Sequence, residues 1–238
     1  MAGETRKTEG IVLSIRPWSR TSHVVSWFTP DAGPVSTVVK GAVRPKSAFL
    51  GQYDLFYTCD LVYYSNSRGE LHPLREASPI ERRDGLRGRW RETTLAGYAT
   101  ELARQLAPAG EEASTWYSFL GRFLDDLSAG TADLPESLVR LETGTLSMAG
   151  LKPDFTGADM SDSWSYFSIE RGRVGEGPRM VRLSSDAMRY LESPKGGIDS
   201  TVVDDAIRFL GLFMAFHLDL PPEMRRLAVQ AVRVAGME

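Results

Sequence analysis

The chain has 238 residues, 42% of them hydrophobic and 25% charged, with a formal net charge of −3. These fractions are close to the average of soluble proteins, and a chain of this length can bury a hydrophobic core. The composition therefore excludes a wholly disordered or fibrous chain. The longest apolar stretch, near residues 209–216, is far shorter than the ~20 residues that span a bilayer, and we expect no signal peptide. The single cysteine, Cys59, excludes an internal disulfide and any multi-cysteine metal site, so a reducing cytoplasm is the expected location.

The charge is distributed unevenly along the chain. Residues 1–91 hold 14 Lys and Arg against 9 Asp and Glu, whereas residues 92–238 hold 14 against 22. The first part therefore carries a net charge of +5 and the second −8. A basic first part indicates contact with a polyanion, although five of its arginines lie in the single run 82–91.

Residues 9–76 predict five short β-strands. Each segment either alternates apolar with polar residues or is rich in β-branched and aromatic residues. The segments cover residues 9–16, 23–29, 34–41, 53–64 and 70–76. Turn-forming residues separate the second strand from the third at 31–34 and the fourth from the fifth at 66–69. Since no helical pattern lies between the strands, we predict a small barrel, most simply an oligonucleotide-binding (OB) barrel, within an α+β fold.

The hydrophobic period changes to that of helices after the basic connector 82–91. Helices are predicted over residues 95–106, 116–127, from a cap at Asp133 to residue 146, and over 198–218 and 223–234. Residues 150–183 lose periodicity and are predicted as a small irregular module. We therefore divide the chain into an OB domain, residues 1–80, and a helical domain, residues 81–238.

Residues 40–47 form a cationic loop. Gly-Ala-Val-Arg-Pro-Lys-Ser at 41–47 approaches a P-loop, but Pro45 stands where the second glycine is needed and has no N–H to offer a phosphate. Nucleotide binding is therefore disfavoured. Lys40, Arg44 and Lys46 instead favour contacts to a nucleic-acid backbone.

Arg16 and Arg20 flank Trp18, an arrangement that suits single strands because bases stack on exposed aromatic rings. The alternative is that Trp18, like Trp27 and Phe28, only packs in the core or a turn. Neighbours in a strand face opposite sides, so one of Trp27 and Phe28 is expected to be buried. The arginines of residues 82–91 are either a phosphate track or, in the alternative interpretation, a solvated linker or a partner for the acidic helices.

Catalytic residues find little support in the sequence, and we expect no enzyme and no cofactor. The three histidines are scattered, and no nucleophile or metal-binding motif is present. His217 on an apolar helix is expected to pack, and Cys59 to be a small buried residue. The adjacent pairs at 125–126 and 204–205 point about 100° apart on their helices, which is typical of a solvated face.

Several stretches resemble one family of proteins. They are Glu9-Gly10-Ile11-Val12-Leu13, Arg16-Pro17-Trp18-Ser19, Phe28-Thr29-Pro30 with Gly33, Lys40 to Ser47, Glu70-Leu71 with Glu76, Tyr98 with Glu101-Leu102, Gly150-Leu151-Lys152-Pro153-Asp154 and Tyr166-Phe167-Ser168. In this order they resemble the RecO family of bacterial recombination mediators. The first 50 residues carry the most specific part of the resemblance.

The resemblance implies an OB barrel fused to a helical domain, with no bond-breaking activity. Such proteins bind single- and double-stranded DNA, anneal complementary strands, bind the C-terminal tail of single-strand-binding protein, and with RecR help to load RecA. They act in the bacterial cytoplasm, on the nucleoid. The DNA-binding residues are then expected to be Arg16, Arg20, Lys40, Arg44 and Lys46, with Trp18 beside them. The tail pocket cannot be assigned to residues, although a partly basic, apolar groove between helices would suit it.

One departure from the family concerns zinc. Many relatives carry two Cys-x-x-Cys pairs near residues 155–160, which here hold no cysteine, and Asp159 and Asp162 cannot replace four thiolates. We therefore expect no metal and a module held by packing of Trp164, Tyr166 and Phe167.

Two other functions stay open: a protein-interaction scaffold with residual DNA binding, and, less favoured, a nucleotide-dependent enzyme.

Overall fold

A computed structural model describes residues 4–66 and 69–233 of the chain, so Ser67, Arg68 and Val234, which fall within the predicted turn and the predicted last helix, lie outside the described residues. Tertiary contacts divide the chain into two compact units, Met1–Gly130 and Thr131–Glu238. The first two helices thus belong with the barrel by contact, whereas the proposed boundary at residues 80–81 separates barrel from helices along the sequence.

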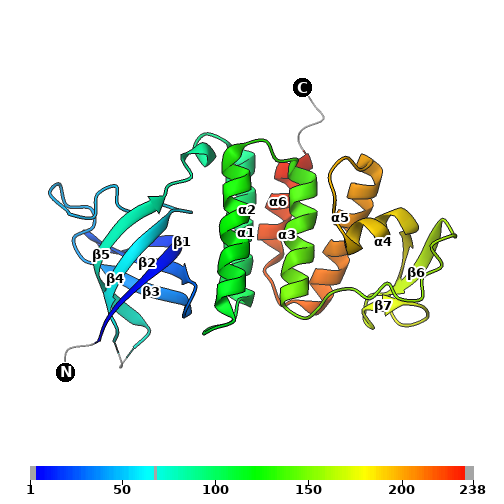
Figure 1. Ribbon diagram of the computed structural model, residues 1–238, viewed down its shortest axis with the longest axis horizontal. Helices are drawn as coiled ribbons and strands as arrows, with labels where there is room; N and C mark the ends of the chain where they lie inside the picture. Colours follow the sequence, from blue (N-terminus) through cyan, green and yellow to red (C-terminus); the bar gives the residue numbers. More distant parts are fainter. Residues whose placement is uncertain (1–3, 67–68, 234–238) are drawn as a thin grey trace. The chain divides into compact units, whose positions relative to one another are not determined.

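The first unit contains the closed five-stranded barrel predicted from the sequence (Figure 1). Its strands are β1 (Thr5–Ser19), β2 (Ser22–Thr29), β3 (Gly33–Val39), β4 (Thr58–Tyr64) and β5 (Leu71–Glu81). The order is β1-β2-β3-β5-β4, with β1 pairing back onto β4 and β3 running parallel to β5. The fourth strand starts at Thr58 rather than residue 53, because the chain turns at Phe56, whose φ is 67°.

Trp27 and Phe28 are both fully buried, so the expectation that only one would be is wrong. Trp27 points into the barrel, where its indole N–H donates to the hydroxyl of Thr37 (2.8 Å). Phe28 faces the other way, and its ring lies 6.4 Å from that of Tyr117 on the second helix. Strand alternation holds, but this stretch of β2 is covered on both faces.

Helices α1 (Trp90–Leu106) and α2 (Ala113–Ala129) complete the first unit. Their buried positions follow the predicted period, and α2 ends at Gly130, which has the left-handed φ of 72°. Gly33, at the start of β3, has φ 74° and lies so close to the α1–α2 connection that a Cβ would meet the Pro108 carbonyl at 2.7 Å. A glycine at this turn therefore lets the helical hairpin approach the barrel.

The arginines of residues 82–91 mostly serve the fold of the first unit. Arg83 is buried, and its guanidinium donates to Asp125 of α2 (2.8 Å) and to the Phe56 carbonyl (2.6 Å). Arg89 donates to the Ser128 carbonyl, also on α2 (3.1 Å). Arg82 and Arg87 lie over the Tyr57 ring and form ion pairs with Asp84 and Asp54. Between the two interpretations, these contacts favour pairing within the protein over a phosphate track.

The second unit is built on three long helices: α3 (Leu134–Met148), α5 (Ser200–His217) and α6 (Pro222–Arg233). The Asp133 side chain caps α3 by accepting from the Glu136 N–H (2.9 Å), as predicted. Glu142 of α3 is buried and accepts two hydrogen bonds from Arg225 of α6 (2.8 and 2.9 Å). A short helix that the periodicity did not indicate, α4 (Ser185–Glu192), packs against α5.

Residues 150–183 are less irregular than predicted. They contain a three-stranded sheet in the order β7-β6-β8, made of β6 (Trp164–Ser168), β7 (Arg173–Val174) and β8 (Met180–Ser184). Strands of two to five residues among glycines and prolines are too short to show a period. Phe167 is buried against Phe155 and Phe209, but Tyr166 is exposed and Trp164 half-buried. The expected packing is therefore complete for Phe167 and partial for Trp164, which lies against Arg182 and Tyr166, whereas Tyr166 is not part of the buried core.

Four other expectations concern the two single residues Cys59 and His217 and two kinds of feature, a metal cluster and a membrane-spanning helix. Cys59 is buried, as predicted, and burial raises the pKa of its thiol to about 12. His217 packs, also as predicted: its Nε2 donates to the Ile169 carbonyl (2.7 Å), and its ring lies 4.3 Å from that of Phe213. Within the described residues, no cluster of three or more His, Cys, Asp or Glu side chains could hold a metal ion, and no helix could cross a membrane.

We predict that Arg83→Met lowers the free energy of unfolding by about 1–3 kcal/mol, because the Phe56 carbonyl loses its buried donor. Arg82→Met is the matched control, since the Arg82 side chain is 54% exposed, and its effect should stay within about 0.5 kcal/mol. Urea denaturation followed by circular dichroism measures both. Equal losses in the two variants would contradict the structural role of Arg83.

Candidate nucleic-acid interface

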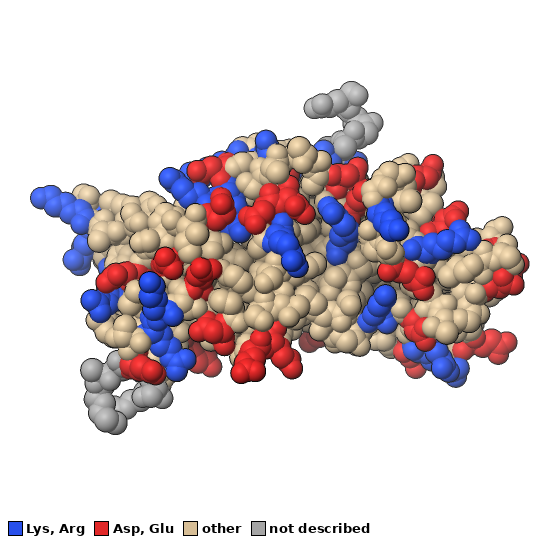
Figure 2. Space-filling view, viewed as in Figure 1, with Lys and Arg blue, Asp and Glu red and all other residues tan. Residues whose placement is uncertain are grey.

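The predicted DNA-binding cations lie on the outside of the barrel and on the loops beside it. Arg16 of β1 is exposed and pairs with Val24 of β2, which in turn pairs with Val38 of β3. Directly opposed residues share a face of the sheet, so these three side chains mark one outer face. Arg20 is exposed in the turn between β1 and β2. In Figure 2 Lys and Arg side chains project from the barrel at the left edge of the view.

Trp18 is 64% exposed, and the local strand geometry explains why. The pairing of β1 with β2 shifts register between Pro17 and Ser19, so Trp18 has no directly opposed residue. Such an irregularity bends a strand and redirects one side chain. The alternative that Trp18 packs in the core is therefore wrong, whereas for Trp27 and Phe28 core packing is what the structure shows.

A hollow of about 430 Å³ brings Trp18, Lys40 and Arg44 together. Its other lining residues are Ser19, Ser22, Val38 and Gly41. The Arg44 N–H bonds to the Gly41 carbonyl (3.1 Å), and the Arg44 side chain runs so close to Gly41 that a Cβ there would meet it at 3.3 Å. The loop therefore places the Arg44 side chain, one of the two cations that line the hollow, against Gly41.

Lys46, Arg16 and Arg20 do not line this hollow, so the structure brings only three of the six predicted residues into one concave site. Lys46 is exposed two residues beyond Arg44 on the same loop. In the part of the chain that is described, none of the five cations forms an ion pair or a side-chain hydrogen bond. Arg16 does act on a carboxylate at longer range, because it helps Arg104 and Gln105 to lower the pKa of Glu101.

A second hollow of about 530 Å³ is lined mostly by the segment between β3 and β4, together with Ile15 and His23 of the barrel strands. Its walls include Tyr53 and Tyr57, and its rim exposes Val43 and Leu50. The Tyr53 hydroxyl lies 2.9 Å from His23 Nδ1, and burial raises the pKa of Tyr53 to about 12, so the phenol stays protonated at neutral pH. The predicted strand over residues 53–64 left no place for this hollow, whereas β4 begins only at Thr58.

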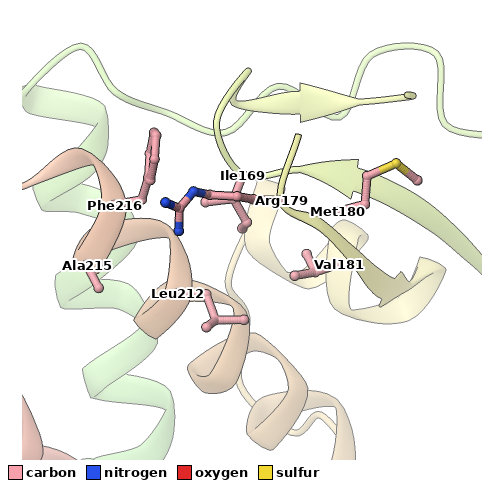
Figure 3. Close-up of a pocket in the computed structure, with 7 residues that line it drawn as sticks. All are labelled: Ile169, Arg179, Met180, Val181, Leu212, Ala215 and Phe216. Carbon is pink, nitrogen blue, oxygen red and sulfur yellow. The ribbon is translucent and has the colours of Figure 1, made fainter. Parts of the chain in front are cut away.

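A third hollow, of about 440 Å³, lies in the second unit between α5 and the β6–β8 sheet (Figure 3). Leu212, Ala215 and Phe216 of α5 form one wall, with Ile169, Met180 and Val181 opposite. Arg179 reaches across it toward Phe216, and its guanidinium carbon lies 5.1 Å from the centre of that ring. The hollow is therefore apolar with one cation at its mouth.

Comparison with known proteins assigns the chain to a family. The family models described as "Recombination protein O N terminal" and "Recombination protein O C terminal" match residues 1–83 and 87–226. The chain belongs to the RecO family. The resemblance seen in the sequence is thereby confirmed, and the barrel followed by helices agrees with the two-part division of RecO proteins.

Relatives within the RecO family are about 30% identical to this chain over the segments that match. "DNA repair protein RecO" of Alkaliphilus metalliredigens is 30% identical over 173 residues, which cover 71% of this chain and 70% of the relative. The protein of the same name from Proteus mirabilis is 31% identical, with 68% and 67% covered. For that of Anaeromyxobacter sp. strain K, 31% identical, the match covers 62% of this chain and 58% of the relative, less than two thirds of its length.

We predict that Trp18→Ala weakens single-strand DNA binding about 5- to 100-fold, because stacking of a base on an aromatic ring contributes about 1–3 kcal/mol. Trp90→Ala is the control: Trp90 is 58% exposed, and it lies at the start of α1, outside the hollow of Trp18. Fluorescence anisotropy with a labelled oligonucleotide measures both. The stacking role fails if Trp18→Ala binds as tightly as the unaltered protein.

Proposed function

We propose that this chain binds DNA in recombinational repair through Arg16, Arg20, Lys40, Arg44 and Lys46, with Trp18 as a stacking residue. The observation that carries the proposal is that these five cations are exposed and have no ion pair within the described chain. Membership of the Recombination protein O family and relatives named DNA repair protein RecO support the same function. The site we propose is an open surface.

The proposed activity is annealing of complementary strands, without any bond being broken. Lys and Arg side chains neutralise phosphates and release counterions, so two backbones approach one another on the same surface. The cations contact phosphates and leave the base edges free to pair. With five contacts to a single strand, the logarithm of the binding constant should fall with the logarithm of salt with a slope of roughly −3.5.

We further propose that the chain acts with RecR to load RecA onto single strands coated by single-strand-binding protein, in the bacterial cytoplasm at the nucleoid. An acidic tail that ends in phenylalanine suits the hollow in Figure 3, because Leu212 and Phe216 offer apolar walls for a ring. Arg179 at its mouth offers a partner for carboxylates. Family membership supports these partners, and the chemistry of the hollow supports this location for the tail.

A protein-interaction scaffold is the second candidate function, and one observation favours it. Val43, Leu50 and Leu55 are exposed apolar residues on the segment between β3 and β4. Exposed apolar residues that cluster on one segment are typical of a protein-binding surface. In that case the chain would bind its protein partners but would not anneal DNA.

The first test reverses charge at Lys40, Arg44 and Lys46 together. We expect single-strand affinity at low salt to fall, the salt slope to become shallower by roughly 2, and annealing of complementary oligonucleotides to be lost. The control reverses Arg189, Arg208 and Arg226, three exposed arginines paired within their own helices. If the first variant binds DNA with unchanged affinity, the barrel surface is not the DNA-binding site. If the unaltered protein binds its protein partners but does not anneal DNA, the scaffold function is favoured.

The second test addresses the tail hollow with Arg179→Glu. We expect binding of a fluorescent acidic peptide ending in phenylalanine to weaken about tenfold or more, because a hydrogen bond to a charged group contributes about 1.5–3 kcal/mol. Single-strand DNA binding should be unaffected. Arg189→Glu is the control, since Arg189 is exposed and does not line the hollow. If the two variants bind the peptide equally well, the tail does not bind in this hollow.

A further inference from the structure

The β6–β8 sheet buries one face, and on the other face Tyr166 and Arg182 are exposed. Phe167 and Leu183 are buried, and Phe167 lies against Phe209 and Phe213 of α5. Side chains alternate along a strand, so Tyr166 and Arg182 belong to the opposite face. Tyr166 is 48% exposed, although aromatic residues of this unit such as Phe155 and Phe209 are buried. The exposed face thus presents an aromatic ring that is about half open to solvent.

Three planar groups lie together on this exposed face. Tyr166 is directly opposite Arg182 in the pairing of β6 with β8. The guanidinium carbon of Arg182 lies 3.8 Å from the centre of the Trp164 ring, and the Trp164 and Tyr166 rings meet edge to face at 5.0 Å. Trp164 is therefore covered by the guanidinium and holds it in place, while Tyr166 stands beside them.

Tyr166 is also left open on its other side. The N–H of Gly175 donates to the Tyr166 carbonyl (3.0 Å), so Gly175 is the neighbour of Tyr166 across from β8. Glycine has no side chain to cover the ring. Of the two residues directly opposite Tyr166, Arg182 and Gly175, one has no side chain, and the phenol ring is 48% exposed and accessible to a planar ligand.

The charge of Arg182 is not neutralised by a carboxylate within the described residues. Its stacked guanidinium keeps N–H donors at its edge, which suits it to bind phosphate or base acceptors. Residues 150–184 as a whole hold five Lys and Arg and five Asp and Glu, so the module has no excess of positive charge. A ligand would therefore gain chiefly from stacking and less from neutralised phosphates.

We propose that Tyr166, Arg182 and Trp164 form a second single-strand contact, on which bases of single-stranded nucleic acid stack. The inference rests on the proposed function and extends it from the barrel to the second unit. Single-stranded nucleic acid fits this surface because it combines exposed base faces with negative charge, and proteins bind such bases on aromatic rings and on arginine planes. The contact should tolerate any base, since every base has a π-face.

The test compares Tyr166→Ala with Tyr166→Phe in the full chain, using oligo-dT and an abasic oligonucleotide of equal length. We expect Tyr166→Ala to weaken oligo-dT binding about tenfold, because the base loses the ring on which it stacks. Tyr166→Phe, which keeps the ring, should bind oligo-dT like the unaltered protein. Binding of the abasic oligonucleotide should be the same in all of them. The slope of affinity against salt should also stay unchanged, unlike that of the charge-reversal variant of the barrel. Arg182→Ala should also weaken oligo-dT binding.

Tyr64→Ala serves as the control, because Tyr64 is a partly exposed tyrosine (39%) of β4 in the barrel. Urea denaturation of each variant checks that the fold is intact. If Tyr166→Ala binds oligo-dT like the unaltered protein, or loses oligo-dT and abasic binding equally, the stacking contact is wrong while the barrel site stands. If Tyr166→Ala loses an acidic peptide and not DNA, the face binds protein instead. If the unaltered protein binds no single strand, the proposed function and this inference both fail.

Discussion

Closure of the barrel by β1 is the contact on which the proposed interface depends. β1 is long enough to pair with two strands, so that Ile11 lies opposite Phe28 of β2 and also opposite Thr58 of β4. The interior is then filled by Trp27, Val12, Leu61 and their neighbours. Because these apolar side chains occupy the interior, we expect a polyanion to bind the outer face and the loops, where the exposed cations lie.

The cations of the first unit fall into two groups with different roles. Arg83, at the end of the barrel, is surrounded by acceptors from the barrel and from α2, and it joins the two parts of the unit. Removing such a buried charge leaves its partners unpaired, so this arginine is committed to the fold. Lys40, Arg44 and Lys46 lie on a loop where water can reach them, and their charge stays available to a polyanion.

Apolar packing holds together the part of the second unit around residues 150–184, which contains no cysteine. Phe155, Phe167 and Phe209 contact one another, with ring centres between 4.9 and 5.9 Å apart, and they join the small sheet to α5. Burial of three aromatic side chains supplies a core for a segment with little regular structure. Because this packing uses one face of β6 only, Tyr166 and Arg182 remain exposed on the other.

The sequence by itself determined the barrel, most of the helices and the cationic loop, because alternation, helical period and turn residues are local properties of the chain. It also named Trp18, Lys40 and Arg44 as candidates, and the structure gathers these three around one hollow. Only the tertiary structure decided that Phe28 and Arg83 are buried, that the short strands of residues 164–184 form a sheet, and that Arg179 meets Phe216. Arg83 and Asp125 are 42 residues apart, and contacts of that kind depend on how whole elements pack, which no local pattern encodes.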